Sequence, residues 1–393
     1  MKYRIQTLNE IAVSGLERLP RDRYEVASNL ADPHAILLRS ADMHKLELPR
    51  SLLAVARAGA GTNNVPVVAL GARGIPVFNA PGANANAVKE LVIAALFLAA
   101  RNLAPAWAFV EGLLAKGGLD GGALDAAVEK GKKGFVGREL PGRTLGVVGL
   151  GAIGVKVANA ARALGMRVIG FDPEITVQRA WQLDAAVEQA QTLDELFARS
   201  DFVTVHVPLV EATRGVVNAQ RLRLARPGSV LLNFARDAVV DEDAVAAALA
   251  AGSLAGYITD FPCVRFRGDP RVVMLPHLGA STVEAEENCA VMAAEQLREF
   301  LEHGNLRNSV NFPEVVMPRA ADAVRIGIAN RNVPNMVGQT TTALAKAGLN
   351  IVDLINKSRG ELAWTLVDVA SPVPESTLAE VRAIEGVLNA RVI

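Results

Sequence analysis

Cysteine is nearly absent from this chain. Among its 393 residues only Cys263 and Cys289 are cysteines, and they lie far apart in the sequence. Zinc sites and redox couples need cysteines at short, paired spacings, so the sequence predicts neither, and we expect no metal. Both cysteines are expected to be reduced thiols, in the core or on the surface.

An excess of charge is absent as well. Lys plus Arg and Asp plus Glu number 41 each, so the formal net charge is zero. Proteins that bind nucleic acid or a membrane surface through charge usually carry a basic excess. We therefore expect neither kind of partner.

Long apolar runs are also missing. The longest strongly apolar run, Leu91–Ala100, is too short to cross a bilayer, and the N-terminal Met-Lys-Tyr-Arg carries charges where a signal peptide would be apolar. We expect a cytoplasmic protein. Its 393 residues exceed what one hydrophobic core usually spans, which predicts two or three domains.

A glycine-rich turn at Gly149–Gly154, Gly-Leu-Gly-Ala-Ile-Gly, is the most informative feature present. It directly follows the apolar run Thr144–Val148, and Asp172 ends the next apolar run about 20 residues on. This spacing is typical of dinucleotide-binding units. The carboxylate of Asp172 would accept hydrogen bonds from a ribose 2′-hydroxyl and repel a 2′-phosphate, so we expect NAD rather than NADP.

Each glycine of the turn has a different expected role. Gly149 allows the tight turn, Gly151 lets the backbone approach a pyrophosphate, and Gly154 lets the following helix pack close to its strand. The pyrophosphate is expected to lie on the backbone amides of a helix that starts at Ala152.

Short runs rich in Val, Ile and Leu alternate with helical stretches through the greater part of the chain. The alternation predicts an α/β fold with two doubly wound, Rossmann- or flavodoxin-like sheets. Strands of the first are expected at Arg4–Leu8, Ala35–Arg39, Leu52–Ala58 and Pro76–Asn79. Strands of the second are expected at Thr144–Val148, Arg167–Phe171, Val203–Val207, Val230–Phe234, Tyr257–Asp260 and Val272–Leu275.

Between these blocks, Gly112–Gly142 is rich in Gly and Lys and is expected to be a solvated linker. Its Lys-Gly-Lys-Lys run at 130–133 is, alternatively, a contact for a phosphate of the cofactor or substrate.

The C-terminal segment has a different pattern, strand-helix-strand-strand-helix-strand, which predicts a ferredoxin-like α+β module. The expected elements are a strand at Ala323–Ala329, a helix at Met336–Ala347, strands at Leu349–Ile355 and Ala363–Val369, a helix at Glu375–Ile384 and a strand at Val387–Val392.

Three residues with useful chemistry follow predicted strands of the second block. A guanidinium at the position of Arg236 suits a bidentate grip on a carboxylate, and Asp260 could orient a carboxamide. His277 is a candidate general base, because imidazole titrates near neutral pH. Beside a nicotinamide site, these side chains together predict a dehydrogenase for a hydroxy acid.

Four segments, in order, resemble the D-2-hydroxyacid dehydrogenases: Arg57–Gly61, Gly149–Gly154, Asn233–Asp241 and Pro276–Thr282. The C-terminal segment, with Asn332-Val-Pro-Asn and Gly348-Leu-Asn-Ile, resembles an ACT domain. The combination covers nearly the whole chain and resembles the short type of D-3-phosphoglycerate dehydrogenases. The resemblance implies NAD-dependent oxidation of 3-phosphoglycerate to 3-phosphohydroxypyruvate, the first step towards serine.

The resemblance also implies a domain organisation. Residues 1–98 and 287–314 would form a substrate-binding domain, 99–286 an NAD-binding Rossmann domain, and 320–393 an ACT regulatory domain. Because ACT domains generally pair edge to edge, a homo-oligomer is expected, either a dimer or a tetramer. L-serine is the expected effector, at an interface between chains, held by the amides of Asn330, Asn332 and Asn350.

Site residues carry over from the family position by position. Arg236 would hold the substrate carboxylate, and His277 would remove the hydroxyl proton. The implied substrate contacts are Arg39, Ser40, Gly59, Ala60, Gly61 and Asn84, with Arg39 and Ser40 on the phosphate side. The implied cofactor contacts are Gly149, Gly151, Ala152, Ile153, Gly154, Asp172, His206, Val207, Pro208, Ala235, Asp260 and Gly279, with His206 structural or on the adenine side.

One position departs from the family pattern. Five residues after the Asp260 position the family has a Glu that pairs with the catalytic histidine, whereas this chain has Arg265. Asp269 is the only other carboxylate before His277. Two alternatives stay open: another D-2-hydroxyacid dehydrogenase, such as a glyoxylate or hydroxypyruvate reductase, and a non-catalytic, NAD(H)-sensing corepressor, which this departure favours.

Overall fold

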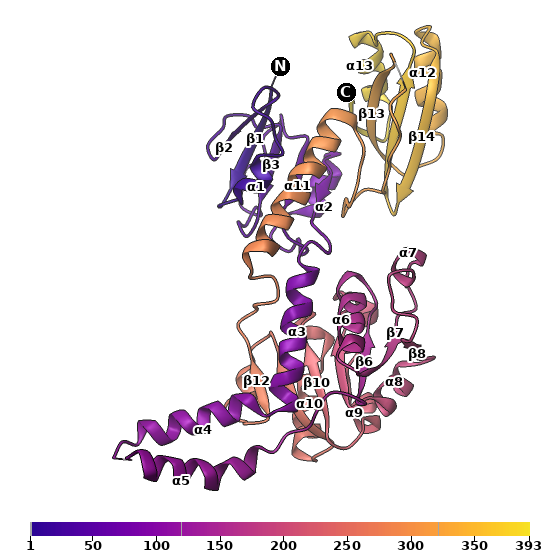
Figure 1. Ribbon diagram of the computed structural model, residues 1–393. Helices are drawn as coiled ribbons and strands as arrows, with labels where there is room; N and C mark the ends of the chain where they lie inside the picture. The colour runs from indigo at the N-terminus through magenta and orange to yellow at the C-terminus, as the bar shows by residue number, and fades with distance from the viewer. Residues whose placement is uncertain (1, 119, 321) are drawn as a thin grey trace. The chain divides into compact units, whose positions relative to one another are not determined.

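The computed structural model describes residues 2–118, 120–320 and 322–393, which form two compact units. The first unit runs as far as Asn84 and resumes with Val283–Ile393, and the second is Ala85–Thr282. Figure 1 shows the elements of both units.

The first unit contains a five-stranded parallel sheet in the order β2-β1-β3-β4-β5. This order is one of the two common doubly wound arrangements. Its strands are β1 (Tyr3–Leu8), β2 (Tyr24–Ala27), β3 (Ala35–Leu38), β4 (Ala54–Arg57) and β5 (Val77–Phe78).

Three helices accompany this sheet, α1 (Val13–Leu16), α2 (Val67–Ala72) and the long α11 (Val283–His303). Helix α11 buries a stripe of small and apolar side chains, among them Ala293, Leu297 and Phe300, in the same core as the strands. Its contact with α1 is so close that a Cβ on Gly15 would lie 2.6 Å from Ala290. The helix that follows the second unit in sequence thus completes the first unit.

The same unit ends in a four-stranded antiparallel sheet in the order β14-β15-β13-β16. The strands are β13 (Val324–Arg331), β14 (Ile351–Arg359), β15 (Leu362–Val369) and β16 (Val387–Val392), and the helices are α12 (Met336–Lys346) and α13 (Glu375–Ala383). The two helices pack over one face of the sheet (Figure 1). The predicted ferredoxin-like module is confirmed, and its arrangement is that of an ACT domain.

The second unit is built on a seven-stranded parallel sheet in the order β12-β11-β10-β9-β6-β7-β8. Its strands are β6 (Thr144–Val148), β7 (Arg167–Phe171), β8 (Glu188–Gln189), β9 (Phe202–Val205), β10 (Ser229–Asn233), β11 (Leu254–Thr259) and β12 (Val272–Met274). The order reverses at β6 and β9, where open α/β sheets bind their ligands beyond the strands' carboxyl ends. Both predicted doubly wound sheets are therefore confirmed.

Helices connect these strands or precede them. Among them are α3 (Ala85–Ala100), α6 (Ala152–Ala163), α7 (Val177–Ala180), α8 (Leu193–Arg199), α9 (Ala219–Leu224) and α10 (Glu242–Ala250). Two of the starts are capped by side chains, since Thr192 accepts a hydrogen bond from the Glu195 amide and Asp241 accepts one from the Ala244 amide.

The prediction of a solvated linker at Gly112–Gly142 is wrong, because helical elements occupy much of this segment. The end of α4 (Leu103–Ala115), all of α5 (Gly121–Gly131) and a 3₁₀ turn at Lys132–Phe135 occupy it. The Asp120 carboxylate caps α5, and an ion pair of 2.6 Å joins Lys132 to Glu129. Capping and this i,i+3 pair offset the low helix propensity of the glycines.

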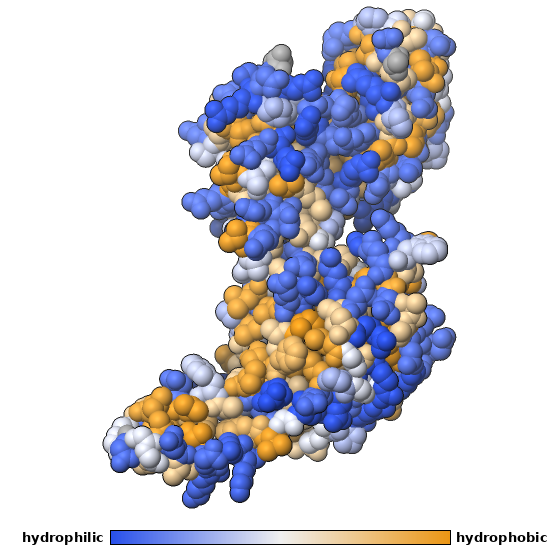
Figure 2. Space-filling model, in the orientation of Figure 1, coloured by the Kyte–Doolittle hydropathy of each residue, from blue (hydrophilic) through white to orange (hydrophobic). Residues whose placement is uncertain are grey.

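Helices α4 and α5 form an arm that has no buried side chain in either helix. Figure 2 shows apolar side chains gathered on this arm, and Trp107 and Leu114 are among its exposed residues. No single helix in the described residues is long and apolar enough to span a membrane, although the bent pair α3 and α4 passes by length and composition.

Candidate active site

The glycine-rich turn between β6 and α6 has the geometry of a pyrophosphate cradle. Gly149 has a φ of +91°, and a Cβ there would lie 2.8 Å from the carbonyl oxygen of His206. A Cβ on Gly154 would overlap the carbonyl oxygen of Gly149, so α6 packs directly on the turn. At Gly151 a Cβ would meet nothing, and this is the open position at which a ligand can approach the backbone.

Backbone amides at the start of α6 complete the cradle. Gly151 is the N-cap residue and offers no side chain to the first turn, so the amides of Ala152 and Ile153 have no side-chain cap. Such amides and the positive end of the helix favour a phosphate anion. The residues present therefore fit a dinucleotide.

Asp172 lies at the end of β7 and is joined to the glycine-rich turn. One of its carboxylate oxygens accepts a hydrogen bond of 2.8 Å from the Leu150 amide, and the other accepts one of 2.9 Å from the Glu174 amide. A carboxylate has further lone pairs for a ribose hydroxyl. Its negative charge is thus fixed beside the cradle, where the sequence places the adenine ribose.

His206, after β9, lies beside the same turn. Its amide donates to the Val148 carbonyl, its Nε2 lies 2.9 Å from the Thr204 hydroxyl, and Nδ1 is buried with no partner among the described residues. Burial lowers the pKa of His206 to about 3, so the ring is neutral at physiological pH. These contacts agree with the structural role expected for it. Val207 and Pro208 continue the loop.

Arg236 follows β10 on a turn that a buried asparagine organises. The Asn233 side chain accepts a hydrogen bond from the Ala235 amide and donates one to the Arg236 carbonyl. Arg236 itself is exposed, and one of its terminal nitrogens donates to the Ala235 carbonyl at 2.6 Å. Its remaining N–H groups are available for a carboxylate.

Asp260, which follows β11, is fully buried and holds the loop that carries His277. Its two carboxylate oxygens accept hydrogen bonds from the Leu278 and Gly279 amides at 2.7 and 2.8 Å. Its carbonyl accepts one from the His277 amide at 3.1 Å. The expected contact of Asp260 with a carboxamide stays a prediction; the contacts in the structure make it a positioning residue for the histidine loop.

His277 is exposed and has a φ of +57°, a left-handed conformation that few residues adopt without support. Its ring packs edge-on against Phe261 at 5.1 Å, a neighbour that sequence reasoning missed. Among the described residues its imidazole has no hydrogen-bond partner. The imidazole is therefore presented to solvent.

Among the described residues, neither Arg265, at the position of the family's Glu, nor Asp269 forms a hydrogen bond or ion pair with His277. Arg265 forms an ion pair with Asp243 at the start of α10. Asp269 is engaged by Arg271, with hydrogen bonds of 2.9 and 2.7 Å. The guanidinium of Arg271 holds the pKa of the Asp269 carboxyl below its usual value, which is the behaviour of a surface ion pair.

In the first unit, Arg39 follows β3 and forms a 2.6 Å ion pair with Glu286 of α11. Arg57, at the end of β4, donates from Nε to the Arg39 carbonyl at 2.9 Å, so the two arginines are neighbours. Burial raises the pKa of the nearby Cys289 thiol, while the charges of Arg57 and Arg39 oppose the rise. Arg57 was not among the predicted contacts, although it opens the quoted 57–61 motif.

The remaining predicted substrate contacts lie on loops of the first unit. A Cβ on Gly59 would overlap the Arg57 guanidinium, and the Ala60 carbonyl accepts a hydrogen bond from Asn79 at 2.6 Å. Ser40 is exposed, and Gly61 and Asn84 are half-buried.

The three asparagines that were predicted to bind the effector differ in their exposure and in their hydrogen bonds. The buried Asn330 donates to the Arg331 carbonyl, and its oxygen accepts from the Thr365 hydroxyl. Asn332 is exposed and donates to the Gly360 carbonyl at 3.0 Å, and Asn350 is exposed next to β14. The two exposed amides are the better placed for a ligand.

Comparison with known proteins agrees with this geometry. Residues 115–279 match a family described as D-isomer specific 2-hydroxyacid dehydrogenase, NAD binding domain. D-3-phosphoglycerate dehydrogenase of Haemophilus influenzae is 32% identical over 391 residues, which cover 95% of this chain and 89% of that protein. Its counterpart in Escherichia coli is 33% identical over 390 residues, with 95% and 90% covered.

Among solved structures, the NAD+-bound 3-phosphoglycerate dehydrogenase of Entamoeba histolytica shares the fold. The TM-score is 0.61 at 24% identity, over 79% of this chain and 99% of that one.

Proposed function

Because the chain belongs to the D-isomer specific 2-hydroxyacid dehydrogenase family and has its NAD-binding domain, we propose that it oxidises 3-phosphoglycerate to 3-phosphohydroxypyruvate. The observation that carries this proposal is the likeness over 95% of the chain to relatives named D-3-phosphoglycerate dehydrogenase. The neighbouring arginines Arg39 and Arg57, at the ends of β3 and β4, support it, because a phosphorylated substrate needs a cationic site in addition to Arg236.

In this reaction Arg236 binds the substrate carboxylate and polarises the C2 oxygen. His277 accepts the proton of the C2 hydroxyl as the C2–H bond breaks and the C2 carbonyl forms. Bound NAD supplies the acceptor for the two electrons and the hydrogen that leave C2. Asp260 and Asn233 act through the loops that they hold, and Asp260 keeps His277 in its strained backbone conformation.

The phosphate is assigned to Arg39 and Ser40. A phosphate dianion would compete with Glu286 for the Arg39 guanidinium, so substrate binding exchanges one anionic partner for another. The amides of Ala60 and Gly61 are assigned to the substrate as well, since the Gly59 amide already donates to the Arg57 carbonyl.

The test is NADH formation by the full-length protein with 3-phosphoglycerate, compared with reduction of the unphosphorylated glyoxylate and hydroxypyruvate. The proposal predicts a strong preference for the phosphorylated substrate. In Arg39→Met that preference should fall about ten- to a hundredfold, with little change on glyoxylate. Turnover of glyoxylate alone would instead make the protein a reductase of the same family.

One observation favours a second candidate function. His277 has no carboxylate partner among the described residues, because Arg265 stands at the position of the family's Glu and Asp269 pairs with Arg271. A protein of this fold that binds NAD(H) without turnover would act as a sensor. Tight NAD(H) binding without turnover of any of the three substrates would establish that alternative.

A further inference from the structure

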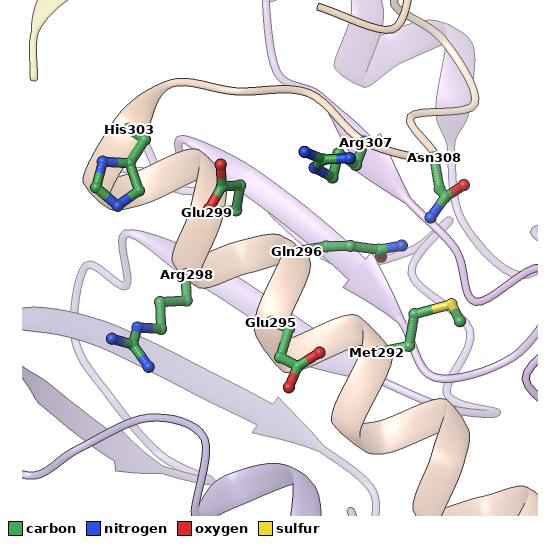
Figure 3. Close-up of a pocket in the computed structure, with 8 residues that line it drawn as sticks. All are labelled: Met292, Glu295, Gln296, Arg298, Glu299, His303, Arg307 and Asn308. Atoms are coloured by element: carbon green, nitrogen blue, oxygen red, sulfur yellow. The ribbon is translucent and has the colours of Figure 1, made fainter. Parts of the chain in front are cut away.

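A cavity of about 510 Å³ lies along the C-terminal half of α11, in the first unit and apart from the residues assigned above. Helix α11 forms one wall, and the turn at Arg307 and Asn308 forms the other (Figure 3). The volume falls within the range of small-molecule sites. None of the residues that line it has a role in the proposed reaction.

A buried side chain in this wall lacks partners. Gln296 is 5% exposed, and both its amide nitrogen and its amide oxygen are buried without a hydrogen bond among the described residues. Figure 3 shows the amide reaching from α11 toward Asn308. An unpaired buried donor and acceptor together are costly for the fold. A ligand with both an acceptor and a donor would satisfy them.

Charges of both signs surround this amide. Arg307 is exposed and forms no ion pair among the described residues, while Glu295 and Glu299 line the opposite wall. Glu295 makes only a long contact with Arg18, at 3.7 Å, and Glu299 accepts a hydrogen bond from Asn305. The carboxylates disfavour a phosphate, and the arginine disfavours a simple cation. No group of metal ligands occurs among the described residues.

The cavity wall is preformed. The chain that leaves α11 is held by hydrogen bonds between Leu306 and Val315 in both directions, at 2.7 and 3.1 Å. The Trp364 indole donates to the Gly304 carbonyl, and Arg325 donates to the His303 carbonyl. A site of this kind needs little reorganisation to bind a ligand.

We propose that this cavity binds a small α-amino acid in its zwitterionic form. Its carboxylate lies against Arg307 and accepts from the Gln296 amide nitrogen. Its ammonium group donates to Glu299 and to the Gln296 amide oxygen. Met292 offers the thioether and methyl surface on which a short side chain packs.

Isothermal titration calorimetry of the full-length protein with glycine and L-alanine, without NAD or substrate, tests this site. Saturable binding is expected. Propionate, which lacks the ammonium group, and glycinamide, which lacks the carboxylate, should each bind at least about tenfold more weakly. Because the assay contains no turnover, its outcome is independent of the reaction proposed above.

Two variants assign the binding to this cavity. Arg307→Met removes an exposed cation and should weaken binding about ten- to a hundredfold, while Arg21→Met, at another exposed arginine of the same unit, should not. Gln296→Leu should abolish binding and raise the thermal midpoint of the ligand-free protein, because an unpaired amide is replaced by an apolar side chain of similar size.

The proposal is overturned by any of three results. These are the absence of saturable binding of both amino acids, equal binding of propionate, and unchanged affinity in Arg307→Met. A thermal midpoint that falls in Gln296→Leu would show that the amide serves the fold through partners of its own, and would also overturn the proposal.

Discussion

At the carboxyl ends of β10 and β11, two buried polar side chains form their hydrogen bonds with backbone groups. Asn233 shapes the turn before Arg236, and Asp260 holds the loop after His277. The side chains assigned to chemistry are both exposed, and those that position them are both buried. In the proposed reaction, the two exposed side chains would therefore depend on two buried ones that contact no substrate.

The first prediction concerns the exposed pair. His277→Ala or Arg236→Ala should lower kcat/KM with 3-phosphoglycerate by about a hundredfold or more, because each removes a group that acts on the substrate. NAD affinity, measured by fluorescence titration, should stay unchanged. His44→Ala, at an exposed histidine paired with Asp42, is the control and should change neither kcat/KM nor NAD affinity. Near wild-type turnover in either active-site variant would remove that residue from the mechanism.

The second prediction concerns the choice of cofactor. Asp172→Asn keeps an oxygen for one of the two backbone amides but removes the charge that repels a 2′-phosphate. The ratio of kcat/KM for NADP to that for NAD should rise. Glu174→Gln, which neutralises an exposed neighbour, should leave the ratio where it was. An unchanged ratio in Asp172→Asn would place Asp172 away from the ribose.

Residue roles were harder to infer from the sequence than residue positions. Asp260 could be placed at a strand end because Gly-Tyr-Ile-Thr precedes it, but its bonds to Leu278 and Gly279 join residues distant in sequence. Phe261 gave no signal beyond its place after Asp260. The engagement of Arg265 by Asp243 also depends on tertiary packing that no local pattern encodes.

At the scale of elements, the loop that carries His277 depends on the side chain of Asp260. Asp260→Asn would turn an amide NH₂ toward one of two backbone N–H groups, and so should lose a charge-assisted bond and create a clash of donors. We expect a lower kcat and a loss of about 1–3 kcal/mol in the free energy of unfolding. Kinetics and urea unfolding measure the two effects.

Asp269→Asn is the matched control for that variant. Asp269 lies in the same connection between β11 and β12, but it pairs with Arg271 on the surface. Its loss should change stability by less than about 1 kcal/mol and leave kcat nearly unaltered. A large loss of activity in Asp269→Asn would mean that this carboxylate supports His277 after all.

Strands and helices could be predicted from the sequence where their apolar residues form a run long enough to show a periodicity. The strands β6 and β10 are buried throughout and β7 is buried at its centre, and each contains a short apolar run that is visible in the sequence. The edge strands β2 and β8 were missed because both are short, and because β2 is only partly buried and β8 is exposed. Helix α5 was missed because its first two residues are glycines and no apolar stripe marks a buried face.

At the scale of the whole molecule, a buried ion pair anchors the C-terminal sheet within the first unit. Arg325 of β13 and Asp368 of β15 are both fully buried and joined by two hydrogen bonds, of 2.7 and 2.8 Å. The same arginine donates to the carbonyls of His303, Met317 and Pro318. The sheet and the chain that leads to it are therefore linked through one guanidinium.

Removal of one partner of this buried ion pair should strongly destabilise the folded protein. Asp368→Asn is expected to lower the free energy of unfolding by about 3–5 kcal/mol at pH 7, because it leaves the guanidinium buried and uncompensated. Burial alone would raise the pKa of Asp368, but hydrogen bonds from Arg325 and the Ala320 amide outweigh it and hold that pKa below its usual value. The stabilisation is thus present above the unfolded pKa of about 4 and is lost as the pH falls through the lower folded value.

Urea unfolding at a series of pH values measures this. The difference between wild type and Asp368→Asn should be constant from pH 7 to about pH 5 and shrink below about pH 4. A difference that does not depend on pH would mean that the carboxyl is not ionised in the folded protein.

The last prediction concerns assembly and regulation. We propose that the C-terminal module binds L-serine between two copies of the chain, through the exposed amides of Asn332 and Asn350, so that serine inhibits turnover. Light scattering should give the mass of a dimer or tetramer, and calorimetry should detect serine binding that Asn332→Ala or Asn350→Ala weakens. The component of serine binding that depends on Asn332 and Asn350 should persist in Gln296→Leu, because the two sites share no residue. A monomer with no serine binding would leave the module without an effector role.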